Sequence, residues 1–81
     1  MTPEGISELI ESQLPDAQAR VVSDDNTHFE AIVISSAFDG ARALKRHQMV
    51  YACLGERMGG DIHALSIRAY TPAEWAQRDG E

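Results

Sequence analysis

The sequence has little cysteine and few basic residues, and each shortage excludes a class of protein. The single cysteine, Cys53, cannot form an internal disulfide, which is typical of proteins from a reducing compartment. There are 7 lysines and arginines against 13 aspartates and glutamates, which gives a formal net charge of −6. Tight non-specific binding of nucleic acid needs clustered basic residues, so this charge disfavours it.

Long apolar runs and targeting segments are also missing. Apolar runs such as Ala31–Ile34 are far too short to cross a membrane. Residues 1–4 show no basic region followed by an apolar stretch, so we expect no signal peptide and a cytoplasmic location. With 81 residues and 43% hydrophobic content, the sequence predicts a single domain over residues 1–81, built on a small core.

The first part of the chain predicts a helix. Thr2 is suited to cap it, and Pro3 is suited to its first position. Apolar residues then recur at helical spacing as far as Leu14, and Pro15-Asp16 should end the helix.

The next part predicts a hairpin. Residues 17–23 and 28–35 are expected strands, and residues 24–26 between them are typical of a turn. The second strand is almost continuously apolar, which favours a central place in the sheet.

A second helix and a third strand follow. One apolar stripe runs through residues 43–58, and Gly59-Gly60 is expected to end this helix. Residues 62–70 then predict a strand. A strand that returns through a helical crossover is parallel to its predecessor, and the connection is right-handed.

The last helix has the clearest start. Thr71 and Glu74 form a capping box, Pro72 suits the first helical position, and Trp75 can pack the helix down. The resulting order, αββαβα, predicts an α+β fold with a mixed three-stranded sheet and its helices on one face.

Groups suited to catalysis are scarce, and we expect no enzyme. A turn accounts for the adjacent carboxylates Asp24 and Asp25, and no nucleophile, base and acid occur as a set. Cys53 has no CxxC partner, so it is interpreted as a half-buried helix residue. The basic residues from Arg42 to Arg46 form either a solvated helix face or a contact for an acidic partner surface or a phosphate.

The histidines are the candidate metal ligands. His63 stands at the start of the third strand, shortly after the double glycine Gly59-Gly60, and it is the sharpest candidate. From the pattern alone, a hydrogen-bonded histidine at the rim of the core explains it equally well. His28 opens the second strand, where a hydrogen-bonding role is the plainer interpretation. His47 lies on the apolar stripe of the second helix and is interpreted as structural.

Several segments, in order and at matching separations over nearly the whole chain, resemble the BolA family. The chain is most similar to the short bacterial acid-stress-type members, which lack a longer loop between the first two strands. Gln48 stands where the family often has arginine, which lowers the local positive charge. The segments are Thr27-His28-Phe29, Phe38-Asp39-Gly40, Arg46-His47-Gln48-Met49-Val50, Ile62-His63-Ala64-Leu65-Ser66 and Thr71-Pro72-Ala73-Glu74-Trp75.

This resemblance implies a class II KH-like fold and partnership with a monothiol glutaredoxin, in cluster trafficking or in the response to iron or stress. A 2Fe–2S cluster would lie between the two proteins, bound by a glutaredoxin cysteine, a glutathione thiolate and a histidine of this chain. By position that histidine is His63, and His28 is the candidate second ligand. The isolated chain is expected to hold no cofactor.

Two other functions stay open. A KH-like transcriptional regulator would bind nucleic acid, but the usual Gly-x-x-Gly clamp is missing between Ser35 and Leu54, so that binding is expected to be weak. A protein-interaction module without a cofactor is the other alternative. Self-association as a homodimer also stays open.

Overall fold

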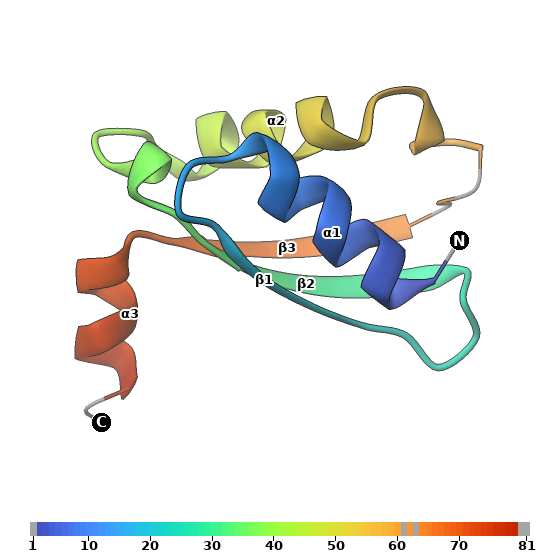
Figure 1. Cartoon of the computed structure of the whole chain (residues 1–81), viewed down its shortest axis with the longest axis horizontal. Coiled ribbons are helices and arrows are strands. Elements are labelled where there is room, and N and C mark those ends of the chain that lie inside the picture. The colour runs from blue at the N-terminus through green and yellow to red at the C-terminus, as the bar shows by residue number, and fades with distance from the viewer. Residues whose placement is uncertain (1, 61, 63, 80–81) are drawn as a thin grey trace.

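The computed structural model describes residues 2–60, 62 and 64–79. The order of elements confirms the predicted αββαβα arrangement, with two short 3₁₀ helices added (Figure 1). The elements are α1 (Pro3–Gln13), β1 (Gln18–Val22), β2 (His28–Ile34), η1 (Ser36–Phe38), α2 (Ala43–Leu54), η2 (Gly55–Arg57), β3 (Ala64–Tyr70) and α3 (Pro72–Asp79).

The sheet has the order β1-β2-β3, so β2 is central, as expected. β1 and β2 are antiparallel, whereas β2 and β3 are parallel. Ala31 of β2 pairs with Val21 on one side and with Ile67 on the other. The mixed three-stranded sheet predicted from the chain order is therefore confirmed.

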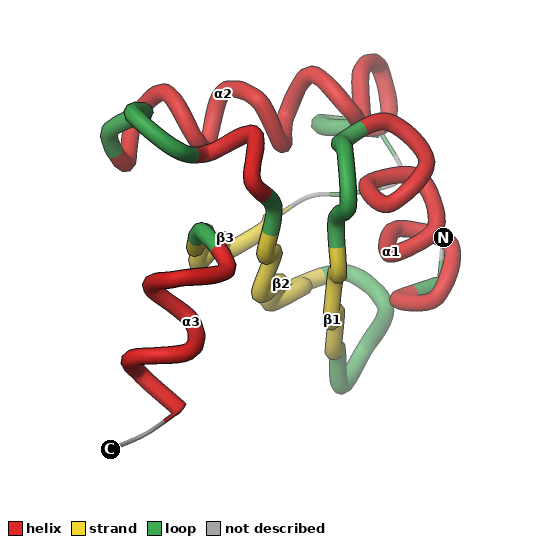
Figure 2. Tube along the Cα trace, turned by 60° about the vertical axis from the view of Figure 1, so that its left-hand side comes forward, coloured by secondary structure: helices red, strands yellow, loops and turns green. Residues whose placement is uncertain are grey.

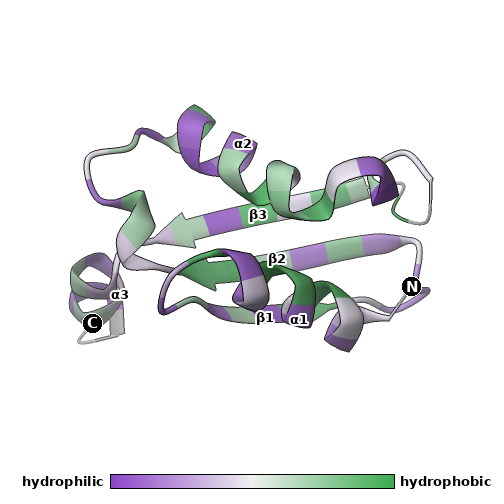
Figure 3. Ribbon diagram, turned by 45° about the horizontal axis from the view of Figure 1, so that its top comes forward, coloured by the Kyte–Doolittle hydropathy of each residue, from purple (hydrophilic) through white to green (hydrophobic). Residues whose placement is uncertain are grey.

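The core lies between one face of the sheet and the helices α1 and α2. Alternate β2 side chains point into it, which gives that strand its regular alternation of exposed and buried residues. Figure 3 shows the hydrophobic segments of α1, α2 and β2 gathered around this core. The buried hydrophobic residues are Ile6, Ile10, Phe29, Ala31, Val33, Phe38, Val50, Cys53, Leu54 and Ile62.

The helix caps follow the sequence signals. Thr2 Oγ1 accepts the N–H of Gly5 at 3.1 Å, and α1 begins at Pro3. At α3, the N–H of Glu74 donates to Thr71 Oγ1 at 3.1 Å, and Glu74 Oε1 accepts the N–H of Thr71 at 2.9 Å. Both predicted starts are therefore confirmed, the second as a complete capping box.

α3 does not share the face that α1 and α2 cover. Figure 2 shows it on the other side of the sheet, beyond the end of β3. Its Trp75 borders a hollow with Ile32 and Ile34 and packs against Tyr70, with ring centroids 5.4 Å apart. The expectation of helices on one face is therefore wrong for α3. The capping box starts α3 directly after β3, and no loop remains to carry the chain back over the sheet.

α2 and β3 are both shorter than the sequence pattern predicted. α2 ends at Leu54 because Gly55 takes a positive φ of 55° and forms the C-cap. Gly59 also has a positive φ, but it follows η2 and does not end the helix. Ile62 forms only an isolated bridge with Met58, and β3 begins at Ala64. No helix in the described part of the chain is long and apolar enough to span a bilayer.

Candidate functional site

His63 lies outside the described residues, so the candidate site is built from its two sequence neighbours. Ile62 is fully buried in the core. Ala64 is the first residue of β3 and pairs with His28, the first residue of β2. Because the parallel strands β2 and β3 begin at the same edge of the sheet, Ala64 lies beside His28, the second candidate ligand.

His28 is open to solvent and held by a carboxylate. Its side chain is 71% exposed, and its Nδ1 lies 3.0 Å from Asp25 Oδ2. Within the described residues its Nε2 has no hydrogen-bond partner. In the neutral ring with the proton on Nδ1, that nitrogen donates to Asp25. One nitrogen held by a carboxylate and the other left open is the usual arrangement of a metal-ligating histidine.

The turn between β1 and β2 fixes this carboxylate. Asp25 Oδ1 accepts the backbone N–H groups of Thr27 and His28 at 2.9 and 3.0 Å. The backbone N–H of His28, its ring and the N–H of Thr27, in that order, hold the pKa of Asp25 well below its ordinary value. Ser23 Oγ closes the turn by accepting from Asn26 N–H at 2.9 Å and donating to the carbonyl of His28 at 2.6 Å. The predicted turn is therefore confirmed, and it also positions the imidazole.

A hollow of about 300 Å³ lies beside His28 on the face of the sheet that α1 and α2 leave uncovered. The small side chains of Ala64 and Ser66 leave space in it, and Asp24, Asp25 and Glu30 make it acidic. In residues 2–60, 62 and 64–79, no three histidine, cysteine, aspartate or glutamate side chains form a group that could hold a metal ion. His28 can offer one imidazole nitrogen, and any further ligands would come from elsewhere.

The structure does not bring His47 or Cys53 to this hollow. Cys53 is buried in the core, where its Sγ donates to the carbonyl of Met49 at 3.3 Å. Burial raises the pKa of its thiol, which makes it a poor nucleophile or ligand. It is thus more deeply buried than the sequence pattern suggested. His47 is partly buried on α2 and borders a separate cavity with Arg42 and Arg68.

For Arg46, the first of the two open alternatives, a solvated helix face, is wrong. Its side chain is only 13% exposed and forms a bidentate ion pair with Glu74. Nη1 lies 2.6 Å from Oε1, and Nη2 lies 3.1 Å from Oε2. Nε donates to the carbonyl of Ala41 at 2.7 Å, and Nη1 donates to that of Ala69 at 3.0 Å. The guanidinium also lies 5.9 Å from the centre of the Phe38 ring. Arg46 therefore ties α2 to the end of β3 and to the start of α3.

Comparison with known proteins gives a consistent result. Residues 7–74 match the family model described as BolA-like protein. Human BolA-like protein 1 is 41% identical over 70 residues, which cover 86% of this chain and 51% of that protein. The acid stress protein IbaG of Escherichia coli K12 is 49% identical over 57 residues, which cover 69% of this chain and 68% of IbaG. The chain thus spans about half the length of the human relative.

The fold gives the same result. The structure of a bolA protein homologue from Coxiella burnetii superposes with a TM-score of 0.79 at 45% identity. The superposition covers 94% of this chain and 97% of that one. The α+β arrangement described above is therefore that of solved BolA structures.

Proposed function

The chain belongs to the BolA-like protein family, and on that premise we propose that it is a non-enzymatic iron–sulfur accessory protein that binds a monothiol glutaredoxin. The two proteins would share a bridging 2Fe–2S cluster in cluster trafficking or in an iron or stress response, in the cytoplasm. The observation that carries the proposal is the pairing of Ala64, which directly follows His63 in sequence, with the exposed, carboxylate-held His28.

The donor chemistry of the described residues fits a shared cluster better than one held by this chain alone. Among the described residues, no group of three histidine, cysteine, aspartate or glutamate side chains could hold a metal ion, whereas His28 offers one open imidazole nitrogen. Imidazole can replace thiolate on one iron of a 2Fe–2S cluster. The remaining ligands would be thiolates of the glutaredoxin and of glutathione. When bound, the cluster would supply a reducible iron centre that can pass between proteins.

We assign the main ligand role to His63. Its neighbours in sequence are Ile62, which is buried in the core, and Ala64, which pairs with His28 at the start of β3. Because Ile62 supplies the buried side chain in this segment, His63→Ala should leave the core intact.

His28 is the proposed auxiliary ligand. The short turn that holds it is fixed by Asp25 and Ser23, so its ring is oriented before any partner arrives. The ionised Asp25 would stabilise an imidazole bound to a positively charged iron. His28 lies on the face of β2 that points away from the helices.

The test is reconstitution with the cognate monothiol glutaredoxin and glutathione, followed by visible absorption and circular dichroism. His63→Ala should fold cooperatively and still bind the glutaredoxin weakly, but lose the spectrum of the histidine-ligated cluster. His28→Ala should show a smaller change. His47→Ala is the matched control and should leave the spectrum unchanged, because His47 borders a different cavity.

Electron paramagnetic resonance of the reduced complex decides the assignment. An unaltered signal from the His63→Ala complex would remove His63 as a ligand. A complex that forms with the wild-type chain but never contains a cluster would leave only an interaction module without a cofactor.

The second candidate is a KH-like regulator that binds nucleic acid. It is favoured by Arg42 and Arg68, which border the same cavity, and disfavoured by the net charge of −6. A gel shift at rising salt separates this function from cluster sharing.

A further inference from the structure

A second hollow of the described surface shares no lining residue with the acidic pocket of His28. It measures about 520 Å³ and lies between the start of α2 and the end of β3. Its charged side chains are all arginines, and none of its lining residues is acidic. The lining residues are Ala41, Arg42, Ala43, Arg46, His47, Arg68, Ala69 and Tyr70.

Arg46 forms the fixed wall of this cavity and does not leave its charge free. Glu74 neutralises it through two hydrogen bonds, and Ala41 and Ala69 accept two more of its N–H groups. The nearby charge of Asp39 also acts on Arg46 and, after Glu74, helps to raise its pKa. Glu74 is therefore the carboxylate that pairs with Arg46.

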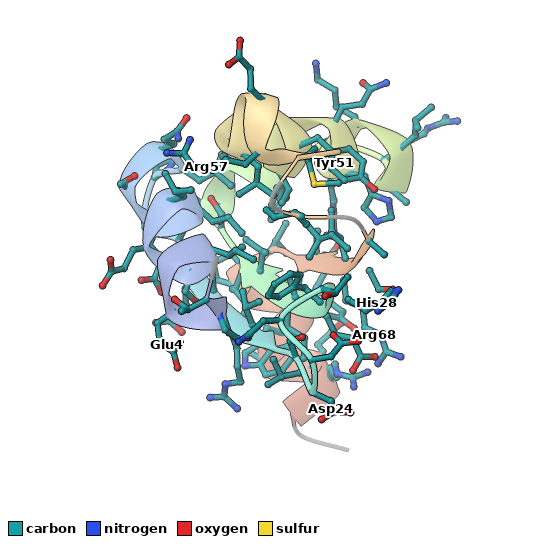
Figure 4. The ribbon with its side chains drawn as sticks, turned by 90° about the vertical axis from the view of Figure 1, so that its right-hand side faces the viewer. Glu4, Asp24, His28, Tyr51, Arg57 and Arg68 are labelled. Atoms are coloured by element: carbon teal, nitrogen blue, oxygen red, sulfur yellow. The ribbon has the colours of Figure 1, made fainter. Side chains whose placement is uncertain are left out.

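Arg42 and Arg68 are left uncompensated. Both side chains are exposed, and neither forms an ion pair with any described carboxylate. The chain has 13 acidic residues, and one of them, Glu30, lines a neighbouring hollow with Arg68 without forming an ion pair with it. Figure 4 shows Arg68 on the opposite side of the molecule from Glu4 of α1. The cavity is thus a local positive site on an acidic protein.

The neighbouring backbone and side chains add to the same charge. The first turn of α2 contains no acidic residue, and its N-cap, Arg42, makes no capping hydrogen bond through its side chain. The partial positive charge of the helix start is therefore not offset locally. Arg78 of α3 does not line the cavity, but its guanidinium lies 5.5 Å from the ring centre of Tyr70, which does. The alanines at 41, 43 and 69 leave the space open.

We propose that this cavity binds the phosphate group of a small phosphorylated compound, with Arg42 and Arg68 as its ligands. Guanidinium groups bind phosphate through paired hydrogen bonds, and two arginines can donate to different oxygens of one phosphate group. The volume falls within the range of small-molecule sites. This site is independent of the proposed cluster, because neither His28 nor the chain around Ala64 borders it.

The test follows backbone amide signals by ¹⁵N–¹H nuclear magnetic resonance while pyrophosphate or adenosine monophosphate is added at constant ionic strength. Both probes should give saturable shifts at Ala43 and Ala69. Arg68→Gln and Arg42→Gln should each weaken binding by about tenfold or more, as expected for loss of a charge-assisted hydrogen bond. Arg57→Gln, on η2, is the control with the same change of charge and should bind as the wild-type chain does.

Two other probes identify the source of the phosphate. Sulfate at the same concentration should bind more weakly than pyrophosphate, and equal binding would reduce the site to a general anion surface and overturn the proposal. A short single-stranded oligonucleotide should bind no more tightly than the mononucleotide. If only the oligonucleotide binds, and Arg68→Gln abolishes that binding, the site belongs to a nucleic-acid interface and not to a small ligand. Identical titrations for Arg68→Gln and Arg57→Gln would also overturn the proposal.

Discussion

At the scale of single residues, Arg46 has the most structural consequence. It lies on α2, yet its donors reach the carbonyl before that helix, the end of β3 and a carboxylate on α3. Glu74 is itself shared, since the same Oε1 accepts the N–H of Thr71 at the capping box. One partly buried guanidinium thus joins α2, β3 and α3. It can do so because a guanidinium carries five N–H donors in a fixed planar arrangement.

Replacement of Arg46 should therefore be costly. Arg46→Gln should lower the free energy of unfolding by about 2 kcal/mol, because carbonyls and a carboxylate lose charge-assisted partners. Urea denaturation followed by circular dichroism measures this change. Lys45→Gln, its exposed neighbour on α2, should change stability by less than about 0.5 kcal/mol. Equal losses in the two variants would show that the change of net charge, and not the loss of the Arg46 hydrogen bonds, lowers the stability.

The lowered pKa of Glu74, the ion-pair partner of Arg46, makes the stability of the fold depend on pH. Arg46, followed by the N–H of Thr71, lowers the pKa of Glu74 from 4.5 to about 2. Because the pKa of the folded chain lies below that of the unfolded chain, the carboxylate stabilises the fold above about pH 4.5, and this contribution is lost as pH falls towards 2. The stability difference between wild type and Glu74→Gln should therefore shrink over that window. A difference that is constant from pH 7 to pH 2 would contradict the ion pair.

At the scale of elements, the end of α2 shows how one glycine sets a boundary. The apolar stripe continues past Leu54 to Met58, so helical periodicity alone favours a longer helix. Gly55 takes φ 55° and ψ −129°, a region that side chains with a Cβ rarely enter, and α2 stops there. The chain then makes one 3₁₀ turn, η2, before it reaches Ile62.

This assignment can be tested with two glycines. Gly55→Ala should destabilise the fold by about 1–2 kcal/mol, because alanine must adopt a strained φ. Gly60→Ala is the matched control: it has no positive φ, and its new Cβ would meet only the backbone oxygens of Glu56 and Arg57, at 3.5 and 3.8 Å. Thermal unfolding should show a clear decrease for the first variant and little change for the second. A larger loss of stability for Gly60→Ala than for Gly55→Ala would instead favour a helix that ends at the double glycine, as the sequence pattern suggested.

At the scale of the whole molecule, charge is distributed unevenly. The chain is acidic overall, and carboxylates surround His28, whereas the arginines Arg42, Arg46 and Arg68 meet at one cavity between α2 and β3. The two candidate sites thus differ in the sign of their charge. A positively charged metal centre suits the first, and an anion suits the second.

This distribution predicts weak binding to nucleic acid. Few phosphates can be neutralised at one small basic cavity, so duplex DNA should bind weakly and be lost near 150 mM salt. A gel shift repeated at several salt concentrations gives the number of neutralised phosphates from the slope. Sequence-selective binding that persists at about 150 mM salt with the affinity of specific complexes would instead make the regulator the primary function.

Local signals in the sequence determined the elements of this protein. Thr2, Pro3 and the Thr71–Glu74 box act within one helical turn, and the turn between β1 and β2 is closed by its own residues, so neighbouring residues suffice to predict them. The chain order then fixed the parallel pairing of β2 and β3, because a helical crossover permits little else. The resemblance of spaced motifs indicated the family before the fold was known. The ligand role of His63, outside the described residues, stays a prediction.

The tertiary structure decided what depends on distant residues. Arg46 and Glu74 are 28 positions apart, and nothing in the local pattern of α2 shows that this arginine is neutralised while Arg42 and Arg68 are not. The side of the sheet taken by α3 depends on where Trp75 finds apolar neighbours on other strands. Burial and charge compensation are sums over elements that only folding brings together, so a sequence can name the participating residues without showing which of them meet.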